Sequence, residues 1–251
     1  MGCTRQQLNA FFEDLLTPQR FKDYCPNGLQ VEGKTDVRQL VTGVTASQAL
    51  IEAARDREAD AILVHHGYFW RSEPPCITGM KAARVRALIK ADINLFAYHL
   101  PLDCHPLYGN NAAFGRLMGI EASEALVPED PGTPVFAGRL GASVTVQGLA
   151  DRITIALDRT PLVIGEGNVK SVAWCTGAGQ GYIDLAADAG ADVYVTGEVS
   201  EQTAHVAQER GIAFIGAGHH ATERYGVQEV GTLAAEALGL SHEFIDIDNP
   251  A

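Results

Sequence analysis

Short apolar runs alternate with longer, alanine-rich stretches along most of the chain. The apolar runs have strand length, and the stretches between them repeat apolar residues at a spacing near 3.6, as amphipathic helices do. Strands are predicted near 38–45, 61–66, 94–99, 135–140, 161–165, 171–176, 192–196, 212–217 and 243–248. Helices are predicted at 47–58, 78–91, 110–118, 180–189, 200–210 and 222–238. This alternation is typical of an α/β protein.

Two parts of the chain match when one is shifted against the other. A shift of 132 positions aligns identical residues, among them Gln48 with Gln180, Ile51 with Ile183, and Asp60 with Asp192. A shift of 120 positions aligns His99 with His219 and Asp103 with Glu223 further along. Each copy therefore has a helix, a strand and later a histidine followed by a carboxylate four positions on. The chain is predicted to be internally duplicated, with two α/β lobes.

The segment VPEDPGTP, at 127–134, contains three prolines and a glycine. Such a sequence does not continue a helix, so a link between the two lobes is predicted there. The first lobe is expected to comprise 1–126 together with 219–251, the C-terminal segment returning to it with its candidate site residues. The second lobe is expected to comprise 127–218.

Charge and composition exclude several classes of partner. The formal net charge is −12, which repels the phosphates of duplex nucleic acid. No apolar stretch reaches the roughly 18 residues that a membrane-spanning helix needs, so no membrane partner is expected. The five cysteines form no C-x-x-C pair, which argues against a disulfide framework and a cysteine-rich zinc site and fits a reducing cytoplasm.

Histidines and carboxylates follow several of the predicted strands directly. They are His65, His66, His99, Asp103, His219, His220 and Glu223. Open α/β sheets place functional residues just beyond the carboxyl ends of their strands. Neutral imidazole and carboxylate are the usual protein ligands of first-row divalent metals. The pattern therefore predicts a metal site.

Spacing alone leaves the geometry of these groups open. A regular strand points His65 and His66 to opposite faces, but the glycine that follows them lets the chain turn, so that both rings converge. Glu223 lies four residues from His219 and three from His220, and either histidine can share a helical turn with it. A lone histidine after a strand is more often a hydrogen-bonded cap; the clustering favours a metal site here.

Several long motifs resemble those of a known family. They are DYCPNGLQVEG, ILVHHGYFW, AYHLPLDCHPLYGNN, CTGAGQGYI, DVYVTGEVSEQTAH and GAGHHATERYG. Spread over nearly the whole chain, they resemble the dinuclear-metal, hexameric-ring proteins of the Nif-three-like family, often labelled GTP cyclohydrolase 1 type 2 homologues. The resemblance implies a homohexamer in which six subunits form a ring.

The resemblance also implies a ligand set for two divalent metal ions, with Glu223 as the bridge and with His219 chosen over His220. The implied ligands are His65, His66, Asp103, His219 and Glu223. Zinc, iron, manganese and nickel all accept histidine and carboxylate ligands, so the identity of the metal stays open.

Two further residues are candidates for catalysis. His99 aligns with His219 in the repeat, so it is expected to support a ligand or transfer protons; packing beneath Pro101 is the alternative. Glu198 ends a predicted strand and either reaches the metal site or belongs to the start of the next helix. The nearby GAGQG lacks the full G-x-G-x-x-G fingerprint, so no nucleotide cofactor is predicted.

The favoured function is a metal-dependent hydrolase acting on a small molecule, because two adjacent divalent ions activate water and stabilise a developing oxyanion. The family label suggests hydrolytic opening of the purine ring of a nucleotide such as GTP, or of a related cyclic amide. The alternative is a non-catalytic protein that binds or delivers metal. A structural zinc site is disfavoured because the ligand set contains no cysteine.

Overall fold

The computed structural model describes residues 2–251, which form two compact α/β units. Unit 1 comprises the chain up to Leu102 together with Gly226–Asp248. Unit 2 comprises Asp103–Tyr225 and the last residues, Asn249–Ala251. The predicted α/β class is confirmed.

Unit 1 is built around a five-stranded sheet. Its strands, in spatial order, are β13 (Ser241–Phe244), β4 (Gln39–Thr45), β5 (Ala61–His66), β6 (Asn94–Ala97) and β2 (Gly28–Val31). The first four are mutually parallel and β2 is antiparallel to β6. A separate two-stranded ribbon joins β1 (Cys3–Thr4) to β3 (Asp36–Val37).

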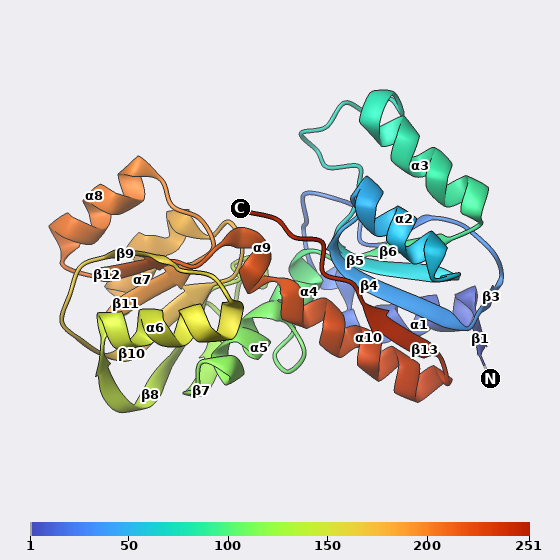
Figure 1. Ribbon diagram of the computed structural model, residues 1–251. Helices are drawn as coiled ribbons and strands as arrows, with labels where there is room; N and C mark the ends of the chain where they lie inside the picture. Colours follow the sequence, from blue (N-terminus) through green and yellow to red (C-terminus); the bar gives the residue numbers. More distant parts are fainter. Residues whose placement is uncertain (1) are drawn as a thin grey trace. The chain divides into compact units, whose positions relative to one another are not determined.

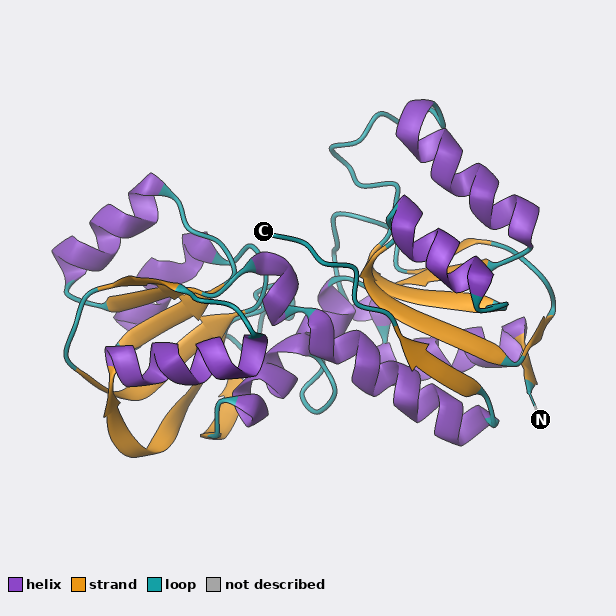
Figure 2. Cartoon of the chain, viewed as in Figure 1, coloured by secondary structure: helices purple, strands orange, loops and turns teal. Residues whose placement is uncertain are grey.

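Helices cover both faces of this sheet (Figures 1 and 2). One face carries α2 (Gln48–Asp56) and α3 (Gly79–Ala91), and the other carries α1 (Arg5–Leu16) and α10 (Arg224–Leu238). Two short helices, η1 (Pro18–Arg20) and α4 (Leu100–Cys104), complete the set. Because both faces are covered, the central strands are buried along nearly their whole length rather than at alternate residues.

Unit 2 has a six-stranded mixed sheet. Its order is β7 (Ile120–Ala125), β8 (Phe136–Thr145), β10 (Asn168–Cys175), β11 (Val193–Thr196), β12 (Ala213–Gly216) and β9 (Leu162–Ile164). Its helices are α5 (Asn110–Leu117), α6 (Val146–Leu157), η2 (Gln180–Tyr182), α7 (Ile183–Asp188), α8 (Glu201–Arg210) and α9 (His219–Thr222). Trp174 packs towards α5 and α6, whereas its strand neighbour Cys175 packs towards α7 and α8, the period-2 alternation of a strand buried on both faces.

The two units repeat one topology. In each, three parallel strands joined by helices follow an edge strand that pairs antiparallel with the third of them: β4, β5 and β6 with β2, and β10, β11 and β12 with β9. Asp60 accepts hydrogen bonds from two consecutive backbone N–H groups at the start of β4, and Asp192 does so within β10, at Lys170 and Ser171. The predicted duplication is confirmed, and these two aspartates make equivalent hydrogen bonds in the two units.

The division between the units differs from the predicted one. The proline-rich segment 127–134 connects β7 to β8, which pair antiparallel in the same sheet, so it is a connection within unit 2. The boundaries fall instead after Leu102 and after Tyr225. The C-terminal segment does return to unit 1, because β13 pairs with β4, but residues 219–225 stay in unit 2.

Among residues 2–251, no helix has the length and apolar character needed to cross a bilayer.

The duplicated aspartates provide a matched test of the fold. Asp60 is buried and also pairs with Lys34 (Oδ1–Nζ 2.6 Å), whereas Asp192 is exposed. Removing a buried, charged acceptor leaves its donors unsatisfied, so Asp60→Ala should lower the free energy of unfolding by about 2–3 kcal/mol and Asp192→Ala by about 1 kcal/mol. Urea unfolding measures the change in free energy for each variant. Equal changes would show that burial of the aspartate does not affect its contribution to stability.

Candidate metal centre

Unit 1 contains a histidine cluster, which we define as His65, His66 and His99. The first two end β5, and His99 follows β6. One ring nitrogen of each lies within 4.8 Å of the others. The ring centroids of His65 and His66 are 4.5 Å apart, so the neighbouring imidazoles converge rather than diverge. Gly67, which follows them, packs closely against its neighbours, because a Cβ there would lie 2.2 Å from the Gln30 side-chain oxygen.

Hydrogen bonds orient the rings of the two adjacent histidines. His65 Nδ1 lies 3.0 Å from the carbonyl oxygen of Tyr98, which can only accept, so the ring proton is on Nδ1 and the lone pair is on Nε2. His66 Nδ1 is hydrogen-bonded to the Thr45 hydroxyl at 3.2 Å. Metal-binding histidines are commonly held in this way through their other ring nitrogen.

His99 is held by a buried aspartate that the sequence analysis missed. Asp23 Oδ1 lies 2.7 Å from His99 Nδ1, and Asp23 Oδ2 accepts hydrogen bonds from the Leu100 N–H and the Asn27 amide. The Asn27 oxygen in turn accepts the backbone N–H of His99. Burial raises the pKa of Asp23, but the hydrogen bonds and charge from these partners outweigh it and lower that pKa to about 2. The carboxylate is therefore ionised and keeps a proton on His99 Nδ1.

Unit 2 contains a carboxylate cluster, which we define as Asp103, His219 and Glu223. Of the two histidines that spacing left open, His219 is the one whose Nε2 lies 3.2 Å from Glu223 Oε2. A carboxylate oxygen of Asp103 lies within 4.8 Å of one of Glu223, and both residues are buried. Two buried carboxylates at this separation repel each other unless a cation or proton lies near them, so the donor set suits a metal ion.

Glu198 orients His219. Its Oε1 lies 2.7 Å from His219 Nδ1, which directs the opposite nitrogen towards Glu223. Burial lowers the pKa of His219, but the hydrogen bonds and charges of Glu223 and Glu198 outweigh it and raise that pKa to about 9. Glu198 precedes α8, and its contact with His219 favours the metal-site interpretation over a role at the start of that helix.

The glycine loop 177–181 packs against the carboxylate cluster. A Cβ on Gly177 would lie 1.9 Å from Glu223 Oε1 and 3.2 Å from His219 Nε2. Gly177 has a φ of 69° and donates its N–H to the Thr222 hydroxyl at 3.0 Å. The absence of a side chain at Gly177 leaves the space that the buried carboxylate occupies. The role of loop 177–181 is therefore to make room for the Glu223 carboxylate, and this role involves no dinucleotide.

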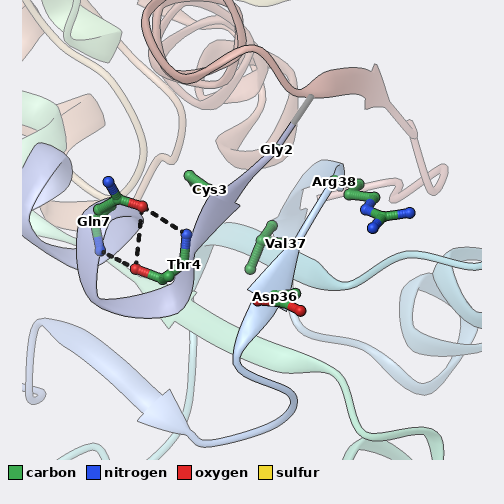
Figure 3. Close-up of a pocket in the computed structure, with 7 residues that line it drawn as sticks. All are labelled: Gly2, Cys3, Thr4, Gln7, Asp36, Val37 and Arg38. Atoms are coloured by element: carbon green, nitrogen blue, oxygen red, sulfur yellow. Dashed lines mark hydrogen bonds between the residues drawn. The ribbon is translucent and has the colours of Figure 1, made fainter.

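A separate cavity of about 570 Å³ lies in unit 1 at the start of α1 (Figure 3). It is lined by Gly2, Cys3, Thr4, Gln7, Asp36, Val37 and Arg38. Thr4 and Gln7 cap the helix through reciprocal hydrogen bonds, drawn in the figure. None of the residues that line this cavity belongs to the histidine cluster or the carboxylate cluster. The cavity is therefore separate from the candidate metal-binding residues.

The fold and the two clusters define an α/β protein in which each unit carries a cluster of imidazole or carboxylate groups suited to binding metal. The model of the Duf34/NIF3 (NGG1p interacting factor 3) family matches residues 3–250. The chain belongs to this family, which confirms the resemblance found in its motifs.

Relatives match over nearly their full length. A protein of Pseudomonas aeruginosa named GTP cyclohydrolase 1 type 2 homolog is 53% identical over 237 residues, covering 94% of both chains. One of Haemophilus influenzae with the same name is 52% identical over 248 residues, covering 98% of both. A solved structure titled "Structural genomics, protein ybgI, unknown function" has a TM-score of 0.93 at 48% identity, covering 99% of this chain and 100% of that one.

The crowding at Gly177 leads to a test of the carboxylate cluster. Gly177→Ala should displace Glu223 and strain a left-handed backbone, so the purified protein should retain at least about tenfold less metal. Gly181→Ala is the matched control, because its Cβ would meet nothing within 4 Å. Elemental analysis of both variants is the measurement. Wild-type metal content in Gly177→Ala would mean that Glu223 is not needed for retention.

The low pKa of Asp23 predicts a pH dependence of stability. A carboxyl whose folded pKa of about 2 lies below its ordinary value stabilises the fold fully above pH 4 or so, and this stabilisation disappears as the pH falls towards 2. Asp23→Asn should therefore unfold about 2 kcal/mol more easily at pH 6, with the difference vanishing in acid. Urea unfolding from pH 2 to 6 measures this. Exposed Asp36→Asn is the control, and a pH-independent gap would refute the ionic role.

Proposed function

We propose that the chain binds two divalent metal ions and is a metal-dependent hydrolase. The proposed ligands are His65, His66, Asp103, His219 and Glu223, with Glu223 as the bridge. Support comes from the chemistry of the histidine and carboxylate clusters and from the family resemblance. The proposed reaction is hydrolytic opening of a purine nucleotide or a related cyclic amide, in line with the name that the relatives carry.

The observation that carries the proposal is the way the imidazoles are held. His65 has its Nδ1 committed to a carbonyl, and His219 has its Nδ1 committed to Glu198. In each ring this leaves Nε2 as the nitrogen for a metal. Zinc, iron, manganese and nickel all fit this donor set.

A bound pair of divalent ions would lower the pKa of a water between them towards neutrality and stabilise negative charge that develops on oxygen. The protein's own contribution includes His99. With its Nδ1 proton held by Asp23, His99 presents Nε2 as a base for an incoming proton, which it can then donate to a leaving nitrogen. Glu198 is proposed to act through His219, by keeping that ring in register.

Metal delivery without catalysis is the second candidate. It is favoured by the 24% exposure of the His219 side chain, which leaves a ligand accessible to an acceptor. The homohexameric ring implied by the family resemblance belongs to the proposal in either case, and the mass of the protein in solution tests it.

Two substitutions test the hydrolase. Glu223→Gln should abolish metal retention and activity together, because an amide lacks the negative charge that offsets two divalent ions. His99→Ala should keep the metals while turnover falls by about 10²–10⁴-fold, as expected for loss of a general acid or base. Elemental analysis after anaerobic purification and a screen of nucleotides and cyclic amides supply the readouts.

Each outcome decides between the roles. Metal lost with His99 would make that residue a ligand, and full activity in His99→Ala would reduce it to a packing residue. If nothing is hydrolysed with any metal while the wild-type protein passes its ions to an apoprotein acceptor, delivery replaces hydrolysis.

A further inference from the structure

Two aromatic side chains lie beside the histidine cluster within unit 1. The Trp70 ring is centred 4.9 Å from that of His99 and 5.9 Å from that of His66. The Tyr24 ring is centred 6.0 Å from that of His99, and Tyr24 is 52% exposed. Neither residue is among the proposed metal ligands, and the exposure of Tyr24 leaves part of its ring accessible to a ligand.

The turn that carries Trp70 is held in a strained conformation. Phe69 has a φ of 66°, a left-handed conformation that bulky residues rarely adopt. Its N–H donates to the Glu73 carboxylate at 3.1 Å, and Lys81 pairs with Glu73 at 3.0 Å while lying over the Phe69 ring. The Trp70 indole N–H is hydrogen-bonded to the carbonyl of Gly67 at 3.2 Å. Strain that several contacts maintain is typical of a functional site.

The same turn is tied to the segment that carries Tyr24. The backbone N–H of Arg71 donates to the carbonyl oxygen of Tyr24 at 2.8 Å. Asp23, the residue before Tyr24, is hydrogen-bonded to His99. Both aromatic residues are therefore anchored by their backbone neighbours, so that little ordering is needed before a ligand binds.

We propose that Tyr24 and Trp70 bind the planar ring of a nitrogen heteroaromatic substrate next to the histidine cluster. This inference rests on the proposed function and names the part of the substrate that the site recognises. Aromatic side chains stack on any planar heterocycle, whereas a sugar phosphate or an aliphatic amide offers no π-face. The proposed substrates are thereby restricted to compounds with a planar heteroaromatic ring, which would lie beside His66 and His99.

The chain suits a direct binding measurement because it has two tryptophans, and Trp174 is fully buried in unit 2. Intrinsic fluorescence of the metal-loaded protein is titrated with guanosine monophosphate, cytidine monophosphate and ribose 5-phosphate. At least one of the two nucleotides should quench the emission, and ribose 5-phosphate should not. In Trp70→Phe the remaining emission comes from Trp174 and should not respond.

Calorimetry with the same compounds then measures how much Trp70 and Tyr24 each contribute to the binding affinity. Trp70→Ala and Tyr24→Ala should each weaken binding of the quenching nucleotide by about 10- to 100-fold. Trp70→Phe and Tyr24→Phe retain an aromatic face and should stay within about threefold of wild type. The two phenylalanine variants keep the test decisive should an alanine variant fold poorly.

The inference is overturned if neither nucleotide binds, if ribose 5-phosphate binds as tightly as the nucleotides, or if both alanine variants bind like wild type. It fails separately from the proposed function. Nucleotide binding through Trp70 without hydrolysis removes only the hydrolase, whereas hydrolysis with an unchanged KM in Trp70→Ala removes only the aromatic site.

Discussion

A neutral imidazole carries one ring proton, and the candidate site depends on hydrogen bonds that fix this proton on Nδ1. In unit 1 the acceptors are the Tyr98 carbonyl for His65 and the Asp23 carboxylate for His99; in unit 2 the acceptor is Glu198 for His219. Each acceptor is placed by the end of a strand or by a segment packed beside one. The parallel strands therefore do more than collect polar residues at one edge, since they also decide which nitrogen of each ring is presented.

Duplication gave both units the same strands but different chemistry at their ends. The shift that aligns Asp60 with Asp192 places His65 and His66 opposite Gly197 and Glu198. One copy therefore ends in two imidazoles, whereas the other ends in a small residue and a carboxylate that orients His219 at the start of α9. A Cβ on Gly197 would lie 2.6 Å from the His219 Cα, so this position, equivalent to His65 in the other copy, has no space for a side chain.

Sequence patterns predicted the parts of the fold that depend on local apolar runs. The strands β5, β11 and β12 are buried along nearly their whole length and their apolar runs predict them, whereas β7 has no such run because Glu121 to Glu124 are exposed. The prolines at 127–134 predict a link between lobes, because nothing local in the sequence indicates that β7 and β8 pair. Asp23 was missed for a related reason: it lies 76 positions from His99, and only the folded sheet brings the two together. The proximity of Glu223 to the histidine pair at 219–220 was predictable because it is local, but the spacing does not distinguish His219 from His220.

The raised pKa of His219 has a consequence for the protein without metal. With a pKa of about 9, the ring is an imidazolium at neutral pH, and its two N–H groups face Glu198 and Glu223. When no metal ion is bound, the positive charge of this imidazolium balances the negative charge of the buried Glu223 carboxylate. A metal ion bound at Nε2 would displace that proton, so metal binding would release a proton to the solution and would be opposed by acid.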